Sequence, residues 1–214
     1  MDLVIAIDGP AASGKGTLAR RLGEAYALPV LDTGRLYRAV GAAVARSGGD
    51  PDDALAAGAA ARALDPSAAA DESLEGREVG EWASRVAVHT VVRDGLLRLQ
   101  REFAARPGGA VLDGRDIGTV IAPGAPVKLY VTASPEARAL RRWSQLTRRG
   151  QAVALEDILR DIRVRDARDG GRATAPLARA PDAVLLDTTD LDIDAAFDAA
   201  HRIVEAARGR LDRS

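Results

Sequence analysis

The feature that most constrains how this chain can fold is a glycine-rich loop close to its amino terminus. An apolar run from Leu3 to Ile7 leads into the loop, and an apolar pattern with helical spacing follows it over residues 18–26. Within the loop, Gly9 is followed after four residues by Gly14 and then Lys15. The order of strand, glycine loop and helix is the structural context that this spacing requires.

The chemistry of this loop points to a bound polyphosphate. Successive backbone N–H groups in such a loop can turn inward, the start of the following helix adds favourable partial charge, and Lys15 can reach the terminal phosphates. The loop therefore predicts a site for a nucleoside triphosphate. Its candidate residues are Gly9, Pro10, Ala11, Ala12, Ser13, Gly14, Lys15, Gly16 and Thr17. The alternative interpretation is a glycine-rich turn that carries a surface lysine.

One position of the loop departs from the usual pattern. Gly16 stands where a hydroxyl normally follows the lysine, and Thr17 comes one residue later. That hydroxyl normally contacts magnesium, so the sequence assigns no certain metal ligand. Thr17, Asp32 and Asp113 are the candidates for contacts made through water.

The rest of the chain alternates helical patterns with short apolar strands, which predicts an α/β fold with a five-stranded parallel sheet covered on both faces. After the first strand, further strands are expected at 28–31, 110–112, 127–131 and 183–186. Helices are expected at 33–47, 52–64, 79–106, 135–149, 155–168 and 193–208, with Ser134 and Pro135 as the N-cap and first turn of one of them. Residues 65–75 are small, polar and without period, and a loop is expected there.

Composition narrows the class of protein. At 214 residues the chain can bury a full core, and one domain with a lid or insertion is favoured over two independent domains. The formal net charge of −1 argues against a general nucleic-acid binder. The chain has no cysteine, and no apolar run approaches the roughly 20 residues of a membrane helix, so a cytoplasmic protein without a membrane partner is expected.

Two polar clusters follow strands that are expected in the sheet. In DTGRLYR, Thr33 and Arg38 lie at a helix start and suit a monophosphate; the alternative is an N-cap and a solvated arginine. In DGRDIG, Arg115 could grip a phosphate and Asp116 could accept from a base amino group. The alternative for this second motif is a structural ion pair between Asp113 and Arg115.

The segment 138–172 is strongly cationic. It has ten arginines and five acids, a local excess of +5 that leaves −6 elsewhere. Arg165, Arg168 and Arg172 are spaced so that one helical face could present three guanidiniums, which stabilise charge on a transferring phosphoryl group. The alternative is that Arg165 and Asp169 form an ordinary i, i+4 pair on an exposed helix.

Six motifs in this order closely resemble bacterial cytidylate kinases, a family of nucleoside monophosphate kinases, over nearly the whole chain. They are IDGPAASGKGT, LDTGRLYR, LDGRDIGT, VRDGLLRLQREF, RDARDGGRATAPL and DAVLLDT. The resemblance implies a phosphate-loop fold and transfer of the γ-phosphoryl group of ATP, with Mg²⁺, to CMP or dCMP. It also implies small nucleotides as the partners, and a monomer is expected.

The resemblance also implies roles for individual residues. Those expected to act in catalysis are Lys15, Arg165 and Arg172. Those expected to bind ATP are the loop residues and Arg168. Those expected to bind CMP are Thr33, Arg38, Ser84, Arg93, Arg115, Asp116, Arg165, Asp169 and Arg172. For Ser84 and Arg93 the residues alone favour a helix serine and a surface arginine, and His89 and His201 are expected to be structural.

The resemblance divides a single kinase domain, 1–214, into regions. Residues 33–106 form the expected acceptor-binding region, and 150–172 form the expected lid. Family members often carry a longer, strand-rich insertion, whereas residues 65–75 are too few and too rich in alanine to build a three-stranded piece, so an acceptor region with a reduced insertion near 65–84 is expected. Two other classes stay open: a kinase for a different small acceptor, and a switch module that hydrolyses a nucleoside triphosphate without an acceptor.

Overall fold

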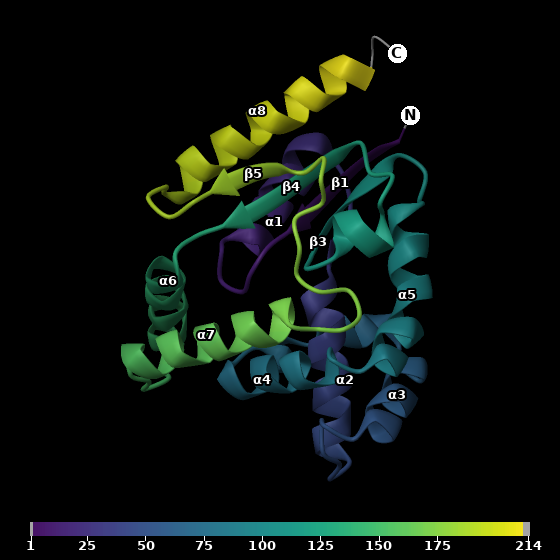
Figure 1. Ribbon diagram of the computed structural model, residues 1–214, viewed down its shortest axis with the longest axis vertical. Helices are drawn as coiled ribbons and strands as arrows, with labels where there is room; N and C mark the ends of the chain where they lie inside the picture. Colours follow the sequence, from purple (N-terminus) through teal and green to yellow (C-terminus); the bar gives the residue numbers. More distant parts are fainter. Residues whose placement is uncertain (1, 212–214) are drawn as a thin grey trace. The chain divides into compact units, whose positions relative to one another are not determined.

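The computed structural model describes residues 2–211, so residue 1 and residues 212–214 of the expected domain lie outside it. Five strands form one sheet: β1 (Leu3–Asp8), β2 (Val30–Asp32), β3 (Gly109–Gly114), β4 (Val127–Thr132) and β5 (Val184–Asp187). Their order is β2-β3-β1-β4-β5, which places the strand before the glycine loop at the centre. Strands β1, β3, β4 and β5 are labelled in Figure 1. The pairs of β1 with β3 and β4, and of β4 with β5, are parallel. The predicted α/β fold with a five-stranded parallel sheet is confirmed.

Two helices share the main core with the sheet. These are α1 (Lys15–Tyr26) and α8 (Ile193–Leu211). The core consists of alternate strand residues and the apolar stripes of the two helices, among them Ile5, Ile7, Leu22, Leu129 and Val204. Because the central strands are buried on both faces, they read as continuous apolar runs, which is why they could be found from sequence.

A helical hairpin follows β4. It consists of α6 (Pro135–Arg148) and α7 (Leu155–Gly170), which pack on each other through a small apolar core of their own. Ser134 Oγ accepts from the N–H of Ala137 at 3.2 Å, so the predicted N-cap is confirmed. The second helix runs two residues past its predicted end, because Gly170 is tolerated in the last turn and the N–H of Gly171 still bonds to the carbonyl of Ala167.

Residues 32–102 form a compact unit, and residues up to 31 and from 103 form the other. The 32–102 unit contains α2 (Thr33–Arg46), α3 (Ala54–Arg62), two short 3₁₀ turns, η1 (Pro66–Ala70) and η2 (Glu72–Leu74), and then α4 (Arg77–Val86) and all but the last two residues of α5 (Thr90–Ala104). Residues 65–75 were expected to be a loop. They form these two turns instead because Asp65 and Asp71 each cap a start, by accepting from the N–H groups of Ser67 and Ser73.

The single helix predicted over 79–106 is wrong. The helix ends at Val86 and a new one begins at Thr90. His89 lies at the break: its N–H donates to the carbonyl of Val86, and its ring contacts the carbonyl of Pro51 at 3.0 Å. Apolar residues keep helical spacing on both sides of the break, so periodicity gave no sign of the change in direction.

Within residues 2–211, every helix is too short or too polar to cross a membrane.

Candidate active site

At Gly9 and Gly14 the glycine loop has a backbone conformation that residues with a side chain rarely adopt. Gly9 has φ of +148°, and a Cβ atom there would lie 1.9 Å from the carbonyl oxygen of Val131 on β4. Gly14 has φ of +93° and forms the N-cap of α1, accepting at 3.1 Å from the N–H groups of Thr17 and Leu18. The two glycines are therefore needed for the close approach to β4 and for the left-handed start of the helix.

Lys15 lies back across the loop that precedes it. Its Nζ donates to the carbonyl of Pro10 at 2.8 Å and lies 3.8 Å from the carboxylate of Asp113 at the end of β3. The side chain is buried, as is that of Asp113. A single cation is thus held between the loop and the neighbouring strand, at the carboxyl edge of the sheet where ligands of parallel sheets bind.

Asp8, the last residue of β1, forms hydrogen bonds with the backbone of Ile117 and Gly118, directly after the DGRD sequence. Its two carboxylate oxygens accept from the N–H groups of Ile117 and Gly118, both at 2.7 Å. Burial raises the pKa of Asp8 to about 6, although the two N–H groups act in the opposite direction. A Cβ at Gly118 would lie 3.3 Å from this carboxylate. The sequence did not reveal these partners of Asp8, because they are more than 100 residues away along the chain.

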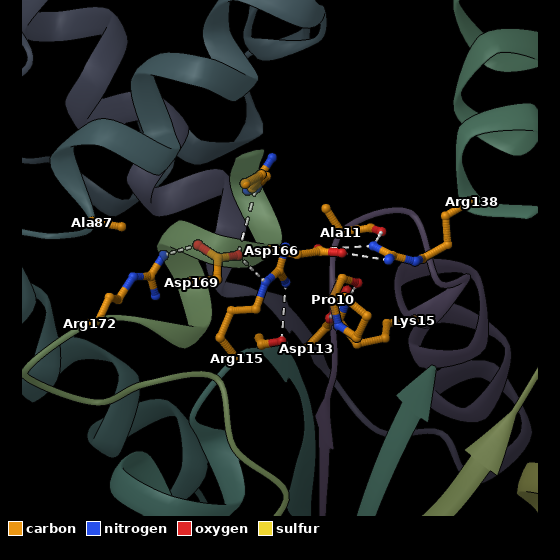
Figure 2. Close-up of polar contacts among 12 residues, drawn as sticks. Pro10, Ala11, Lys15, Ala87, Asp113, Arg115, Arg138, Asp166, Asp169 and Arg172 are labelled. Atoms are coloured by element: carbon orange, nitrogen blue, oxygen red, sulfur yellow. Dashed lines mark hydrogen bonds and ion pairs between the residues drawn. The ribbon is translucent and has the colours of Figure 1, made fainter. Parts of the chain in front are cut away.

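Three arginines surround the carboxylate of Asp169 (Figure 2). Arg115 Nε lies 3.1 Å from it, Arg165 Nε lies 3.8 Å away, and Arg172 donates to its other oxygen. Asp169 is fully buried. Burial by itself would raise the pKa of Asp169, but the charges of the three arginines outweigh it and keep the pKa below its ordinary value.

These contacts change two of the sequence interpretations. Arg165 and Asp169 do form the i, i+4 pair, but its carboxylate is buried and shared, so the pair does not belong to an exposed helix face. For Arg115, the structure adds a carboxylate 54 residues further along the chain. The residues next to Arg115 in the sequence gave no sign that it would contact Asp169. Arg168 is half-buried on α7. Asp116 is buried directly before the short helical turn η3 (Ile117–Ile121).

The remaining predicted residues lie in the 32–102 unit. Thr33 is buried at the start of α2, and Ser84 is buried on α4. Arg38 Nη1 donates to the carbonyls of Leu74 and Gly76, at 2.9 and 3.3 Å.

Arg93, on α5, is 7% exposed, so it is not the surface arginine that its sequence alone favoured. It donates to the carbonyl of Ala87 at 3.4 Å and lies 5.7 Å from the ring centroid of Tyr37. Its burial reflects the break in the helix before it, which supplies the carbonyl.

The oxygen atoms near the loop are of the kind that Mg²⁺ accepts. Asp113 lies against Gly16, where a Cβ would be 3.3 Å from its Oδ2, and Thr17 Oγ1 accepts from Arg20 at 3.4 Å. Within residues 2–211 no three histidine, cysteine, aspartate or glutamate side chains gather as a metal site. Such a donor set fits an ion that is held mainly by phosphates and water, with one or two protein contacts.

The loop at the end of the central strand, its lysine and the buried arginine cluster together define a phosphate-loop protein of the phosphoryl-transferring class. The family model for cytidylate kinase matches residues 5–206. The chain therefore belongs to the cytidylate kinase family, and it is an ATP-dependent nucleoside monophosphate kinase by that membership.

Individual relatives agree with the family match. The chain is 64% identical over 210 residues to a cytidylate kinase of Caulobacter vibrioides (strain NA1000 / CB15N), covering 98% of this chain and 99% of the relative. It is 63% identical over 206 residues to a cytidylate kinase of Xanthobacter autotrophicus, covering 96% and 99%. A solved structure of an uncharacterized protein from Eubacterium ventriosum is similar with a TM-score of 0.55 and 14% identity, over 96% of this chain and 99% of that one, which shows a shared fold alone.

Proposed function

We propose that this enzyme transfers the γ-phosphoryl group of ATP to CMP or dCMP and forms ADP with CDP or dCDP. The observation that carries the proposal is the match of the cytidylate kinase family over residues 5–206, which includes the loop, DGRDIG and the arginine cluster. The names of relatives at 63 and 64% identity support the same reaction.

The reaction needs positioning and charge neutralisation from the protein, with no nucleophilic side chain. The acceptor phosphate oxygen is already ionised at neutral pH, so the barrier lies in bringing two anions together. Loop N–H groups and Lys15 would hold the donor phosphates, and Arg165 and Arg172 would stabilise the transferring group. Both arginines form ion pairs with Asp169, so during transfer each would contact the Asp169 carboxylate and the phosphates together.

Magnesium completes the donor side of this proposal. When bound, Mg²⁺ would neutralise charge on the donor phosphates and keep several waters. The candidate protein contacts are Thr17 and Asp113, and Asp32 is a further candidate through water. Lys15, 3.8 Å from Asp113, would orient that carboxylate.

The acceptor would be recognised by two groups of residues. Thr33, Arg38 and Arg115 would hold its phosphate, and Ser84, Arg93 and Asp116 would read its base. Asp169 with Arg165 would contact the sugar, while Arg168 would lie near ATP. The burial of Ser84 and Arg93 supports this proposal, because a buried arginine and hydroxyl with defined partners can discriminate between bases.

The regional assignments are part of the proposal. The compact unit 32–102 supports an acceptor-binding region over 33–106. Residues 65–75 form two short turns, which supports a reduced insertion in that region. The helix α7 supports a lid over 150–172 that would exclude water during transfer. A monomer and a cytoplasmic location also remain proposals, and light scattering on the purified protein tests the first.

A coupled ADP-release assay with ATP and magnesium tests the function against CMP, dCMP, UMP, AMP and no acceptor. Strong turnover with the two cytidine nucleotides alone is expected, because a carboxylate that accepts from an amino group rejects the carbonyl of UMP. A preference for AMP would indicate a different acceptor kinase. ADP release without an acceptor would indicate a switch module.

A further inference from the structure

Arg138, on the first turn of α6, connects three separate segments. Its side chain is 3% exposed. Nε donates to the carbonyl of Ala133 at 2.9 Å, and Nη1 donates to the carbonyl of Ala11 in the phosphate loop at 3.2 Å. Nη1 and Nη2 also donate to the two carboxylate oxygens of Asp166 on α7, at 3.0 and 2.5 Å (Figure 2).

The contact with Ala11 bears on how the loop presents its N–H groups. In a trans peptide the C=O and the following N–H point in opposite directions. Arg138 holds the carbonyl of Ala11, and Thr188 Oγ1 holds the carbonyl of Ser13 at 3.0 Å. The N–H groups of Ala12 and Gly14 are thereby turned away from these two side chains. Ala12 has φ of +60°, which a non-glycine residue keeps only when its surroundings hold it.

The contact with Asp166 bears on the arginine-bearing end of α7. Asp166 and Asp169 are three residues apart and so lie on the same side of the helix. Asp169 binds the arginines 115, 165 and 172, and Asp166 binds Arg138. The last two turns of α7 therefore contact the arginine cluster through Asp169, and they contact Arg138, which binds the phosphate loop, through Asp166.

We propose that Arg138 and Asp166 are positioning residues that couple the phosphate loop to α7, a proposal that rests on the proposed function. Arg138 sets the orientation of the loop and so the affinity for ATP. Asp166 transmits that position to the helix that carries Arg165, and so sets the rate of transfer. The fork of the guanidinium makes both contacts at once, which a lysine cannot do.

Two substitutions separate these effects. Arg138→Gln removes both connections, and we expect the Kd for ATP to rise about 10-fold and kcat to fall about 10-fold or more. Asp166→Asn leaves the contacts of Arg138 with Ala11 and Ala133. We therefore expect kcat to fall about 10-fold while the Kd for ATP, measured calorimetrically without acceptor, changes less than about 3-fold. Arg138→Lys should not restore either value.

The same two helices supply a matched control. Arg163 on α7 and Glu136 on α6 form an ion pair at 2.9 Å, but their side chains are 61% and 62% exposed. Glu136→Gln removes an α6–α7 ion pair without reaching the loop, and we expect kcat and Kd to stay within about 2-fold of the original values.

A double variant tests the coupling itself. Because Arg138→Gln already breaks the link, adding Asp166→Asn should lower kcat no further, so the two effects should not multiply. Multiplying effects would overturn the proposal, as would a lower melting temperature with kcat and Kd unchanged. If Arg138→Gln fails to fold, Asp166→Asn alone tests the proposal: a fall in kcat with little change in the Kd for ATP supports it, and an unchanged kcat overturns it. The Kd for ATP is measured without an acceptor. If the proposed acceptor chemistry is wrong, the original protein will fail in the acceptor assay, and that result is separate from the effects of these substitutions.

Discussion

At the scale of single residues, Gly9 illustrates how little room the loop leaves. We expect Gly9→Ala to lower the free energy of unfolding by several kcal/mol, roughly 3 or more, because its Cβ would meet the Val131 carbonyl at 1.9 Å in a backbone that L residues avoid. Chemical denaturation measures this. Gly124→Ala is the control, since a Cβ there meets nothing within 4 Å and should cost less than about 0.5 kcal/mol. Equal losses would contradict the steric explanation.

Arg172 belongs to the same scale. We expect Arg172→Ala to lower kcat by about 100-fold or more and to change the Kd for ATP much less, because a charge that acts on the transferring group matters most in the transition state. Steady-state kinetics with CMP and calorimetry with ATP measure the two quantities. An unchanged kcat would remove Arg172 from the mechanism. Arg179→Ala serves as the comparison, because Arg179 is an exposed arginine in the segment that follows.

At the scale of elements, the α6–α7 hairpin depends on its own small core. Leu146 is fully buried against Ile158 and Ile162. We expect Leu146→Ala to cost about 2–5 kcal/mol and to raise amide hydrogen exchange mainly over residues 135–170, since the hairpin packs as a unit. Leu140→Ala on the same helix is the control, because Leu140 is 54% exposed. Faster exchange spread evenly over both compact units would contradict a local core.

At the scale of the whole molecule, Asp8 makes stability depend on pH. Its pKa is about 6 in the folded protein against 3.8 as the ordinary value. At pH values between 3.8 and about 6, the folded state binds a proton at Asp8 more strongly than the unfolded state does. The stabilisation is therefore fully present below about pH 4 and is lost as pH rises to about 6.

Comparison with Asp8→Asn isolates this effect. We expect the free energy of unfolding of the original protein, relative to that of Asp8→Asn, to fall by on the order of 2 to 3 kcal/mol between pH 4 and 7. Urea unfolding at each pH measures the difference. A difference that stays constant with pH, or a carboxyl carbon NMR midpoint near 4, would contradict it.

Much of the fold could be predicted from sequence where short-range chemistry decides. Apolar strands, the N-cap at Ser134 and the glycine spacing depend on neighbours within a few residues, and each was found. The single helix over 79–106 was wrong: the chain breaks at His89, whose ring contacts the distant carbonyl of Pro51, and apolar periodicity does not record such a contact. The turns at 65–75 were missed because an aspartate cap leaves no periodic signal.

The sequence by itself determined the phosphate loop and the fold class, because residue spacing specifies a strand, a left-handed glycine turn and a helix start, and the resemblance of its motifs indicated the family. Only the tertiary structure decided which charges meet. Arg115 finds Asp169 across 54 residues, and Arg138 finds the loop carbonyl of Ala11 across 127. Such pairings depend on which side chains the sheet and helices bury together, and local sequence patterns do not record that.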